Sequence, residues 1–185
     1  MMRTFFILIV LSAICKLNAV SQIPQKGYFL INDTTNSYPN IDKILELKEF
    51  KNKVVYIDIW GTRCAPCLKE FQHAGKLKEK FQNDSIIFLY LCSQYKLERD
   101  KMNEKLWKEL ILKNDLKGTH LLLSNECYIK GFWEKFKDQY TEERSYGIPI
   151  FLLVDKKGVI RNFDAPRPSS EEVLYEKIQA LLNEK

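Results

Sequence analysis

The sequence has few glycines, prolines and cysteines, and it has no block of basic residues longer than two. Seven Gly, six Pro and five Cys among 185 residues exclude a collagen-like repeat, a low-complexity linker and a small disulfide-stapled domain. Basic residues exceed acidic ones by only five, 29 against 24, and they are scattered, so no patch predicts nucleic-acid binding. The remaining composition, 45% hydrophobic and 29% charged, is typical of one ordinary globular domain.

Only one long hydrophobic run is present, and it lies at the N-terminus. Residues 1–19 have the pattern of a secretory signal peptide: Arg3 supplies a positive charge and Phe5–Ile14 is apolar. About ten apolar residues are too few for a membrane-spanning helix, which needs ~20. A retained membrane anchor and a lipid on Cys15 are the alternatives. We therefore expect an exported protein, in the periplasm or another extracytoplasmic compartment, where disulfides persist.

The rest of the chain alternates between strand and helix patterns. Residues 20–35 are expected to form a leader with one short strand near Tyr28–Ile31, and residues 36–185 one domain. The expected strands are residues 54–60, 86–91, 119–123, 150–154 and, after a hairpin turn at 155–158, 159–163. Helices are expected after Cys64, around Met102–Ile111 and around Ile129–Phe136. A last helix is expected to open with a capping box at Ser169–Glu172, with Val173, Leu174, Ile178 and Leu181 facing inward. This order predicts an α/β fold whose central sheet is covered by helices on both faces.

Two cysteines stand where the strand 54–60 gives way to a helix. Cys64 is expected at the helix N-terminus, where free backbone N–H groups and the helix dipole stabilise a thiolate and lower its pKa. Pro66 suits the first turn because its missing N–H costs little there. Cys67 lies further into the helix and is less exposed. The pair therefore predicts thiol–disulfide exchange, in which Cys64 attacks a substrate disulfide and Cys67 resolves the mixed disulfide.

The same pair has two other interpretations. A structural zinc site needs four ligands, but Cys92 and Cys127 are isolated and neither His73 nor His120 stands in a ligand-spacing pattern. We expect no metal, and no cofactor besides the redox-active disulfide itself. A purely structural disulfide is the second interpretation, although so short a loop contributes little entropy. Cys92 and Cys127 are expected to be buried free thiols, with a disulfide between them as the alternative.

Two motifs together resemble a known superfamily. Trp60-x-x-x-Cys64-Ala65-Pro66-Cys67 follows an apolar strand, and Gly147-Ile148-Pro149 stands some eighty residues later. Over residues 28–185 this arrangement resembles the thioredoxin superfamily. With the signal peptide and a helical insertion between Ser93 and Gly147, the chain is most similar to exported disulfide reductases of the TlpA/ResA type. The resemblance implies a thioredoxin-like fold with a central mixed sheet.

The resemblance also assigns roles to individual residues. It implies that Pro149 is a cis proline facing the cysteines and that the Ile148 backbone pairs with a substrate peptide; an ordinary trans turn is the alternative. Asp58 matches a buried acid that accepts the proton of the second cysteine, and burial raises a carboxyl pKa toward the range this role needs. A solvent-facing aspartate is the other possibility. Trp60 is expected to pack beneath the active-site loop.

Two positions, Arg63 and Ile150, depart from the pattern of the family. Arg63 stands where many relatives carry an uncharged residue, and its charge is expected to stabilise the Cys64 thiolate or to repel basic substrates. Ile150 replaces a threonine that is common after the cis proline, which alters the hydrogen bonds open to a substrate. Ala65-Pro66 tunes the reduction potential in a direction that the sequence does not give.

The resulting hypothesis is an exported thiol–disulfide oxidoreductase that reduces protein disulfides. Its partners are expected to be protein disulfide substrates and a membrane dithiol electron donor, with no nucleic acid, and the chain is expected to be a monomer. Two alternatives stay open. One is a thioredoxin-like Cu(I)-binding metallochaperone, since soft thiolates suit Cu(I). The other is a redox-inert binding domain.

Overall fold

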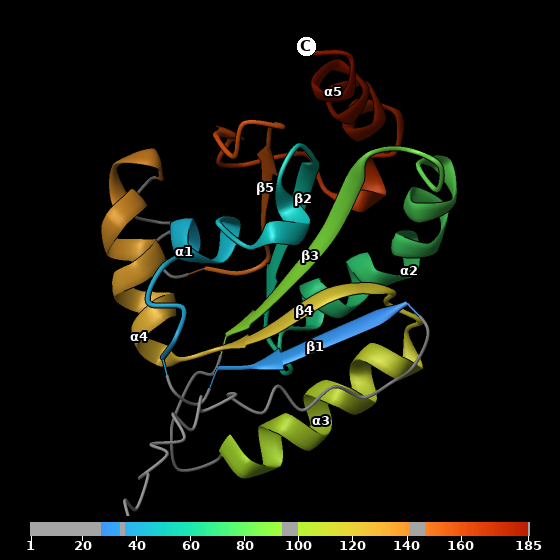
Figure 1. Ribbon diagram of the computed structural model, residues 1–185. Helices are drawn as coiled ribbons and strands as arrows, with labels where there is room; N and C mark the ends of the chain where they lie inside the picture. The colour runs from blue at the N-terminus through green and yellow to red at the C-terminus, as the bar shows by residue number, and fades with distance from the viewer. Residues whose placement is uncertain (1–26, 34–35, 94–99, 141–146, 185) are drawn as a thin grey trace, which may run out of the picture.

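The computed structural model describes residues 27–33, 36–93, 100–140 and 147–184 (Figure 1). The expected signal peptide at residues 1–19, the alternative of a lipid on Cys15 and most of the expected leader lie outside the described residues. Within the described ranges, no helix has the length and apolar content needed to cross a bilayer.

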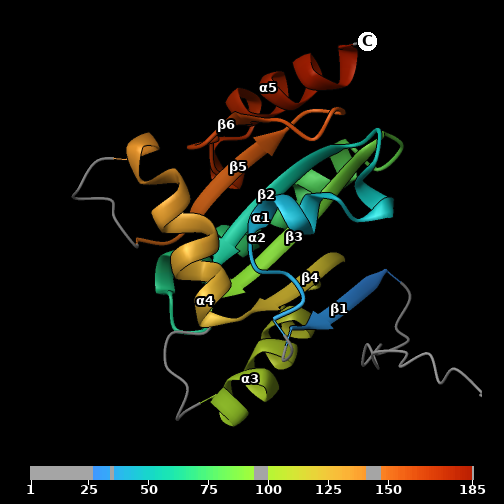
Figure 2. The same cartoon turned by 60° about the vertical axis from the view of Figure 1, so that its left-hand side comes forward.

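A six-stranded mixed sheet forms the centre of the molecule, with strand order β1-β4-β3-β2-β5-β6 (Figure 2). Strands β1, β4, β3 and β2 run parallel to one another, β5 is antiparallel to β2, and β6 is antiparallel to β5. Their bounds are Tyr28–Asn32 (β1), Val54–Trp60 (β2), Ile86–Ser93 (β3), Gly118–Leu123 (β4), Ile150–Val154 (β5) and Ile160–Asn162 (β6). The predicted strands are confirmed. The insertion before the cis proline contributes β4, which lies between β1 and β3.

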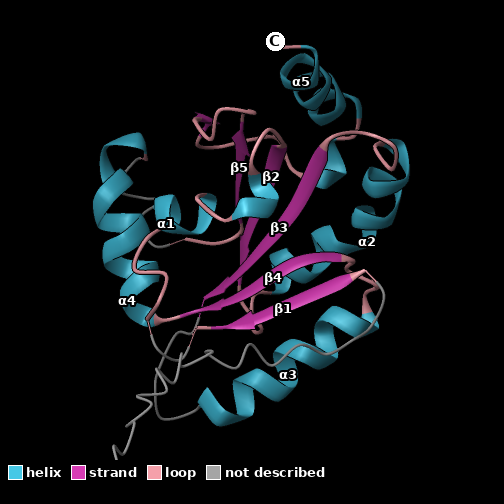
Figure 3. Ribbon diagram, in the orientation of Figure 1, coloured by secondary structure: helices cyan, strands magenta, loops and turns pink. Residues whose placement is uncertain are grey.

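Helices cover both faces of the sheet, as predicted (Figure 3). α1 and α4, with the π-helical turn after α4, pack on one face, and α2, α3 and α5 pack on the other (Figures 1 and 2). The helices are Ile41–Leu45 (α1), Ala65–Lys80 (α2), Asp100–Lys113 (α3), Asn125–Tyr128 (α4) and Glu172–Asn183 (α5), with the π turn at Ile129–Glu134 and short 3-10 turns at Lys48–Phe50, Lys137–Gln139 and Pro168–Ser170.

The side chains of β2 alternate between the two helical layers. Val55, Ile57 and Ile59 belong to the core on the α1 and α4 side. Val54, Tyr56 and Trp60 belong to the core under α2, α3 and α5. Because side chains alternate along a strand, Asp58 lies with the second set, beneath α2. The predicted face of Asp58 is therefore confirmed.

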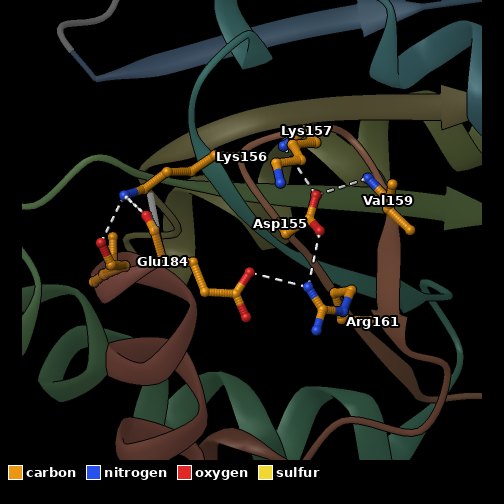
Figure 4. Close-up of polar contacts among 7 residues, drawn as sticks. Asp155, Lys156, Lys157, Val159, Arg161 and Glu184 are labelled. Carbon is orange, nitrogen blue, oxygen red and sulfur yellow. Dashed lines mark hydrogen bonds and ion pairs between the residues drawn. The ribbon is translucent and has the colours of Figure 1, made fainter.

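The predicted hairpin between β5 and β6 is held by Asp155 (Figure 4). Its carboxylate accepts hydrogen bonds from the backbone N–H groups of Lys157 and Val159, at 2.9 and 3.0 Å. The same carboxylate pairs with Arg161 at 3.1 Å, and Arg161 also bonds to Glu184 at 2.9 Å. The hairpin is thereby tied to the C-terminal end of α5.

The predicted capping box at Ser169–Glu172 is wrong. The Ser169 hydroxyl and backbone N–H both donate to Glu70 on α2, each at 3.0 Å. α5 therefore begins without a side-chain cap, after Glu171 with a φ of 41°. Val173, expected to face inward, is 56% exposed. The other predicted core residues of this helix are buried: Leu174, Ile178 and Leu181.

Candidate active site

The end of β2 and the start of α2 bring Cys64 and Cys67 together. Cys64 is the N-cap residue of α2, and its sulfur accepts a hydrogen bond from the backbone N–H of Cys67 at 3.2 Å. A disulfide bond joins the two sulfurs. Pro66 lies in the first turn, as predicted. The positive end of a 16-residue helix therefore lies at the cysteine pair.

The two cysteines differ in exposure. Cys64 is partly exposed, whereas Cys67 is 0% exposed. Cys67 belongs to a core cluster that also contains Trp60 and Phe71. Cys64 is therefore the member of the pair that a molecule in solution can approach, whereas Cys67 is enclosed by the core.

Trp60 belongs to the same core cluster as Cys67, and Cys64 packs against that cluster. Its side chain is completely buried, and its indole packs edge-to-face on Phe71, with ring centroids 4.9 Å apart. Its carbonyl oxygen accepts a hydrogen bond from the Ser93 hydroxyl at 3.3 Å. These contacts hold the end of β2 in place between α2 and β3. The turn that carries Cys64 therefore begins from a closely packed part of the core.

A groove of about 570 Å³ opens beside Cys64. It is lined by the turn before α2, the first residues of α2, the end of β3 and the segment before β5: Gly61, Thr62, Arg63, Cys64, Ala65, Pro66, Ser93 and Ile148. Gly61 lies in close contact with the opposite wall, because a Cβ there would come within 2.9 Å of the Ile148 Cδ1 atom. The residues at the mouth of the groove, Arg63, Ala65 and Pro66, are exposed.

The peptide bond between Ile148 and Pro149 is cis, as predicted. The carbonyl oxygen of Ile148 lies 3.7 Å from the Cys64 sulfur, so this cis peptide unit lies against the cysteine pair. Ile150, the next residue, is fully buried in β5 opposite Ile59. Its side chain therefore belongs to the core and not to the wall of the groove.

Asp58 is buried beneath α2, with only 3% of its surface exposed. Burial raises the pKa of its carboxyl well above the ordinary value, the nearby Glu70 carboxylate raises it further, and Lys78 lowers it. The Oδ1 atom has no hydrogen-bond partner among the described residues. Such a carboxyl keeps its proton at a pH where an exposed aspartate has lost it. The described residues contain no hydrogen bond between Asp58 and either cysteine.

Comparison of the sequence with known protein families agrees with this fold and with the cysteine pair. The profile of the Redoxin family matches residues 30–177, which is most of the chain. The chain belongs to the Redoxin family. This family lies within the thioredoxin superfamily, and the thioredoxin-like fold predicted from the sequence is confirmed.

Proteins similar to this Redoxin-family chain carry names of thiol–disulfide enzymes. Thiol-disulfide oxidoreductase ResA of Bacillus thuringiensis is 32% identical over 98 residues, which cover 48% of this chain and 56% of that protein. ResA of Bacillus subtilis is 29% identical over 68 residues, 37% of this chain and 35% of that protein. The chain thus spans about half the length, or less, of these curated relatives.

Solved structures give a longer match. A putative thiol-disulfide oxidoreductase from Bacteroides vulgatus is 32% identical, with a TM-score of 0.54, and the match covers 74% of this chain and 83% of that one. A thiol-disulfide isomerase from Corynebacterium glutamicum shares the fold, with a TM-score of 0.56, 22% identity and coverage of 74% and 85%.

The sequence analysis of this Redoxin-family protein missed Glu70. This residue lies one helical turn after Cys67 on the inner face of α2, and it is 6% exposed. Both of its carboxylate oxygens accept hydrogen bonds from Ser169. Its charge raises the pKa of Asp58. The available signal was its spacing, since an acid three residues after Cys67 shares the face that carries Phe71 and its apolar neighbours.

Lys78 is the second residue that the sequence did not reveal. Its ammonium nitrogen is buried without a hydrogen-bond partner among the described residues, and it lies 5.0 Å from the ring centre of Tyr90 and 5.9 Å from that of Phe88. Burial lowers the pKa of this amine to about 7. A lysine from α2 therefore lies close enough to influence the ionisation of Asp58.

The two other described cysteines, Cys92 and Cys127, are free and buried, as expected. They lie in core clusters on opposite faces of the sheet, which excludes the alternative of a disulfide between them. Burial raises the pKa of Cys127 to about 12, and that of Cys92 above its ordinary range.

His120 is buried against Tyr90, and burial lowers its pKa to about 3. The described residues contain no group of three or more His, Cys, Asp or Glu side chains able to hold a metal.

Proposed function

We propose that this protein is a thiol–disulfide oxidoreductase that reduces disulfides in other proteins. One observation carries the proposal: the disulfide between Cys64 and Cys67 lies at the N-terminus of α2, with Cys64 partly exposed and Cys67 buried. A structural crosslink has no need of an exposed sulfur at the positive end of a helix, whereas an attacking thiolate does. The names of the relatives support the same activity.

The proposed reaction starts from the reduced pair. The Cys64 thiolate attacks one sulfur of the substrate disulfide, the substrate bond breaks, and the other substrate sulfur leaves as a thiolate that takes up a proton. Cys67 then loses its proton and attacks the Cys64 sulfur, which restores the protein disulfide and releases the second substrate thiol. Two electrons and two protons pass to the substrate in all.

Asp58 is proposed to accept the proton of Cys67 in the second half of the reaction. The support is its burial under α2 and a carboxyl pKa that lies above the ordinary range. A base is most effective when its pKa lies near the working pH, because it then both accepts and returns a proton readily. Since no direct hydrogen bond joins Asp58 to the cysteines, the transfer requires a bridging water or a small movement of the reduced site.

The substrate is proposed to bind along the groove beside Cys64. Ile148, before the cis Pro149, is one of the residues that line the groove, and its backbone is proposed to pair with an extended peptide. Pairing of backbone groups explains how such a site accepts many sequences. Trp60, Ala65 and Pro66 are proposed to hold the turn that carries Cys64 beside this groove.

The compartment and the electron donor are proposed from the sequence. The signal-like residues 1–19 indicate export, and an exported reductase needs a thiol donor outside the cytosol. A membrane protein that presents a dithiol fits this requirement. Re-reduction then transfers two electrons from that dithiol to the Cys64–Cys67 disulfide by the same exchange.

Turnover of insulin disulfides with dithiothreitol tests the activity. We expect the wild type to accelerate insulin reduction, Cys64→Ala to abolish it, and Cys67→Ala to accumulate a mixed disulfide on Cys64 that mass spectrometry detects. The reduction potential gives the direction: a value near ~−270 mV favours a reductase and one near ~−120 mV an oxidant. Equal rates for wild type and Cys64→Ala would contradict the proposal.

A further inference from the structure

Arg63 brings a charge to the active-site groove. It stands between the end of β2 and Cys64, its side chain is exposed, and it is one of the residues that line the groove. Among the described residues, no carboxylate forms an ion pair with it, and no hydrogen bond or ring contact holds its guanidinium. Arg161 shows the contrast, because Asp155 and Glu184 both bind it (Figure 4).

The other described walls of the groove do not offset this charge. Apart from Arg63, the lining consists of glycine, small polar, apolar and cysteine residues, with no acid or base among them. The N-terminus of α2 adds a partial positive charge at the same place, and the first turn of α2 contains no acidic residue. The described part of the groove is therefore electropositive beside the attacking sulfur.

We propose that Arg63 is a specificity-determining residue that selects disulfides flanked by an acidic side chain. The proposal rests on the proposed function, and it names the substrate class of that same site. An aspartate or glutamate next to the reacting cysteine of the substrate pairs with the guanidinium, which offers a planar fork of donors that matches a carboxylate. A lysine at that position is repelled.

The selection acts at the first step of the exchange. When the Cys64 thiolate attacks the substrate sulfur, the flanking residue of the substrate lies beside the residue that precedes Cys64 in the chain. A charge pair there speeds encounter and holds the peptide, as charges at the rim of an interface generally do. Stabilisation of the Cys64 thiolate by Arg63 is a separate effect, because it changes the rate for every substrate by the same factor.

Three peptides that differ at one position separate these effects. Each contains one internal disulfide, and the residue before its first cysteine is Asp, Asn or Lys. The protein is reduced with dithiothreitol and freed of it, then mixed with each peptide at low ionic strength, and the rate of protein oxidation is followed. From the strength of exposed ion pairs we expect Asp to react about threefold faster than Asn and about tenfold faster than Lys. The differences shrink in high salt.

Two variants complete the experiment. Arg63→Gln is expected to bring the three rates together, whereas Lys69→Gln, which removes the same charge from an exposed residue of α2 outside the groove, keeps the order. Equal rates of the wild type on all three peptides would overturn the proposal and leave the proposed function intact. The same holds if Arg63→Gln slows all three peptides by one common factor. If no peptide oxidises the reduced protein, the proposed function itself fails.

Discussion

Replacement of Asp58 by asparagine tests the burial of this carboxyl directly. Asparagine has nearly the same shape but does not titrate, so the variant removes only the proton equilibrium and a constant difference in packing. In the wild type, burial is the largest cause of the raised pKa, and the Glu70 carboxylate adds to it. The folded protein therefore holds a proton on Asp58 at a pH where the unfolded chain has released it.

The sign and size of the effect follow from proton linkage. Above the unfolded pKa of about 3.9, the folded state binds more protons at Asp58 than the unfolded state does, so the stability of the wild type falls as the pH rises. The contribution is about 1.4 kcal/mol per pH unit and continues until the pH reaches the folded pKa of Asp58. Asp58→Asn does not lose stability in this way. Its free energy of unfolding relative to the wild type therefore rises with pH by the same slope and levels off once the pH passes the folded pKa of Asp58.

Urea unfolding of the two oxidised proteins measures this difference. The free energy of unfolding is compared from about pH 4 to about pH 8, a range that begins at the unfolded pKa of aspartate. A gap that grows with pH supports the argument, and the pH at which it levels off gives the pKa of Asp58. In a Glu70→Gln background we expect the gap to level off at a lower pH, because one cause of the raised pKa is gone. A gap that stays constant over the whole range would refute the reasoning.

Two further predictions concern packing and hydrogen bonding. Gly131→Ala should destabilise the protein by about 3 kcal/mol, because the new Cβ would lie 2.2 Å from the carbonyl oxygen of Pro39; Gly75→Ala, with open space around it, should stabilise α2 by about 1 kcal/mol. Urea midpoints of both variants check the contrast, and equal midpoints would contradict it. Ser169→Ala should lower the free energy of unfolding by about 1–2 kcal/mol because the Glu70 carboxylate loses a donor, and an unchanged midpoint would show that this hydrogen bond contributes nothing.

The sequence predicted those parts of the fold and the site that depend on neighbouring residues. The buried strands, the helix that starts after Cys64 and the face of Asp58 all follow from periodicity over a few residues. Each of these features has its physical cause within one element or one turn, so the order of the residues is enough to indicate it. The cis bond at Pro149 was instead implied by the resemblance to the thioredoxin superfamily.

The features that the sequence missed join distant segments. Glu70 and Ser169 are 99 residues apart, and neither position has a pattern that indicates the other. The burial of the Lys78 ammonium depends on aromatic rings supplied by β3. The spacing of residues along α2 shows which side chains face inward, but it does not show what they meet there.

The failed capping box shows how a distant bond overrides a local rule. Capping by Ser169 would satisfy an N–H group at the start of α5 and would stabilise the protein by about 1 kcal/mol. Glu172 and Val173 are exposed there, however, so water can bind the free N–H groups instead. Glu70 is 6% exposed and has far less access to water, and a buried carboxyl group without donors costs more than an exposed helix end without a cap. Ser169 therefore stabilises the protein more when it binds Glu70. The same bond holds the Glu70 side chain near Asp58, so the residue that breaks the local rule also helps to raise the pKa of the proposed proton acceptor.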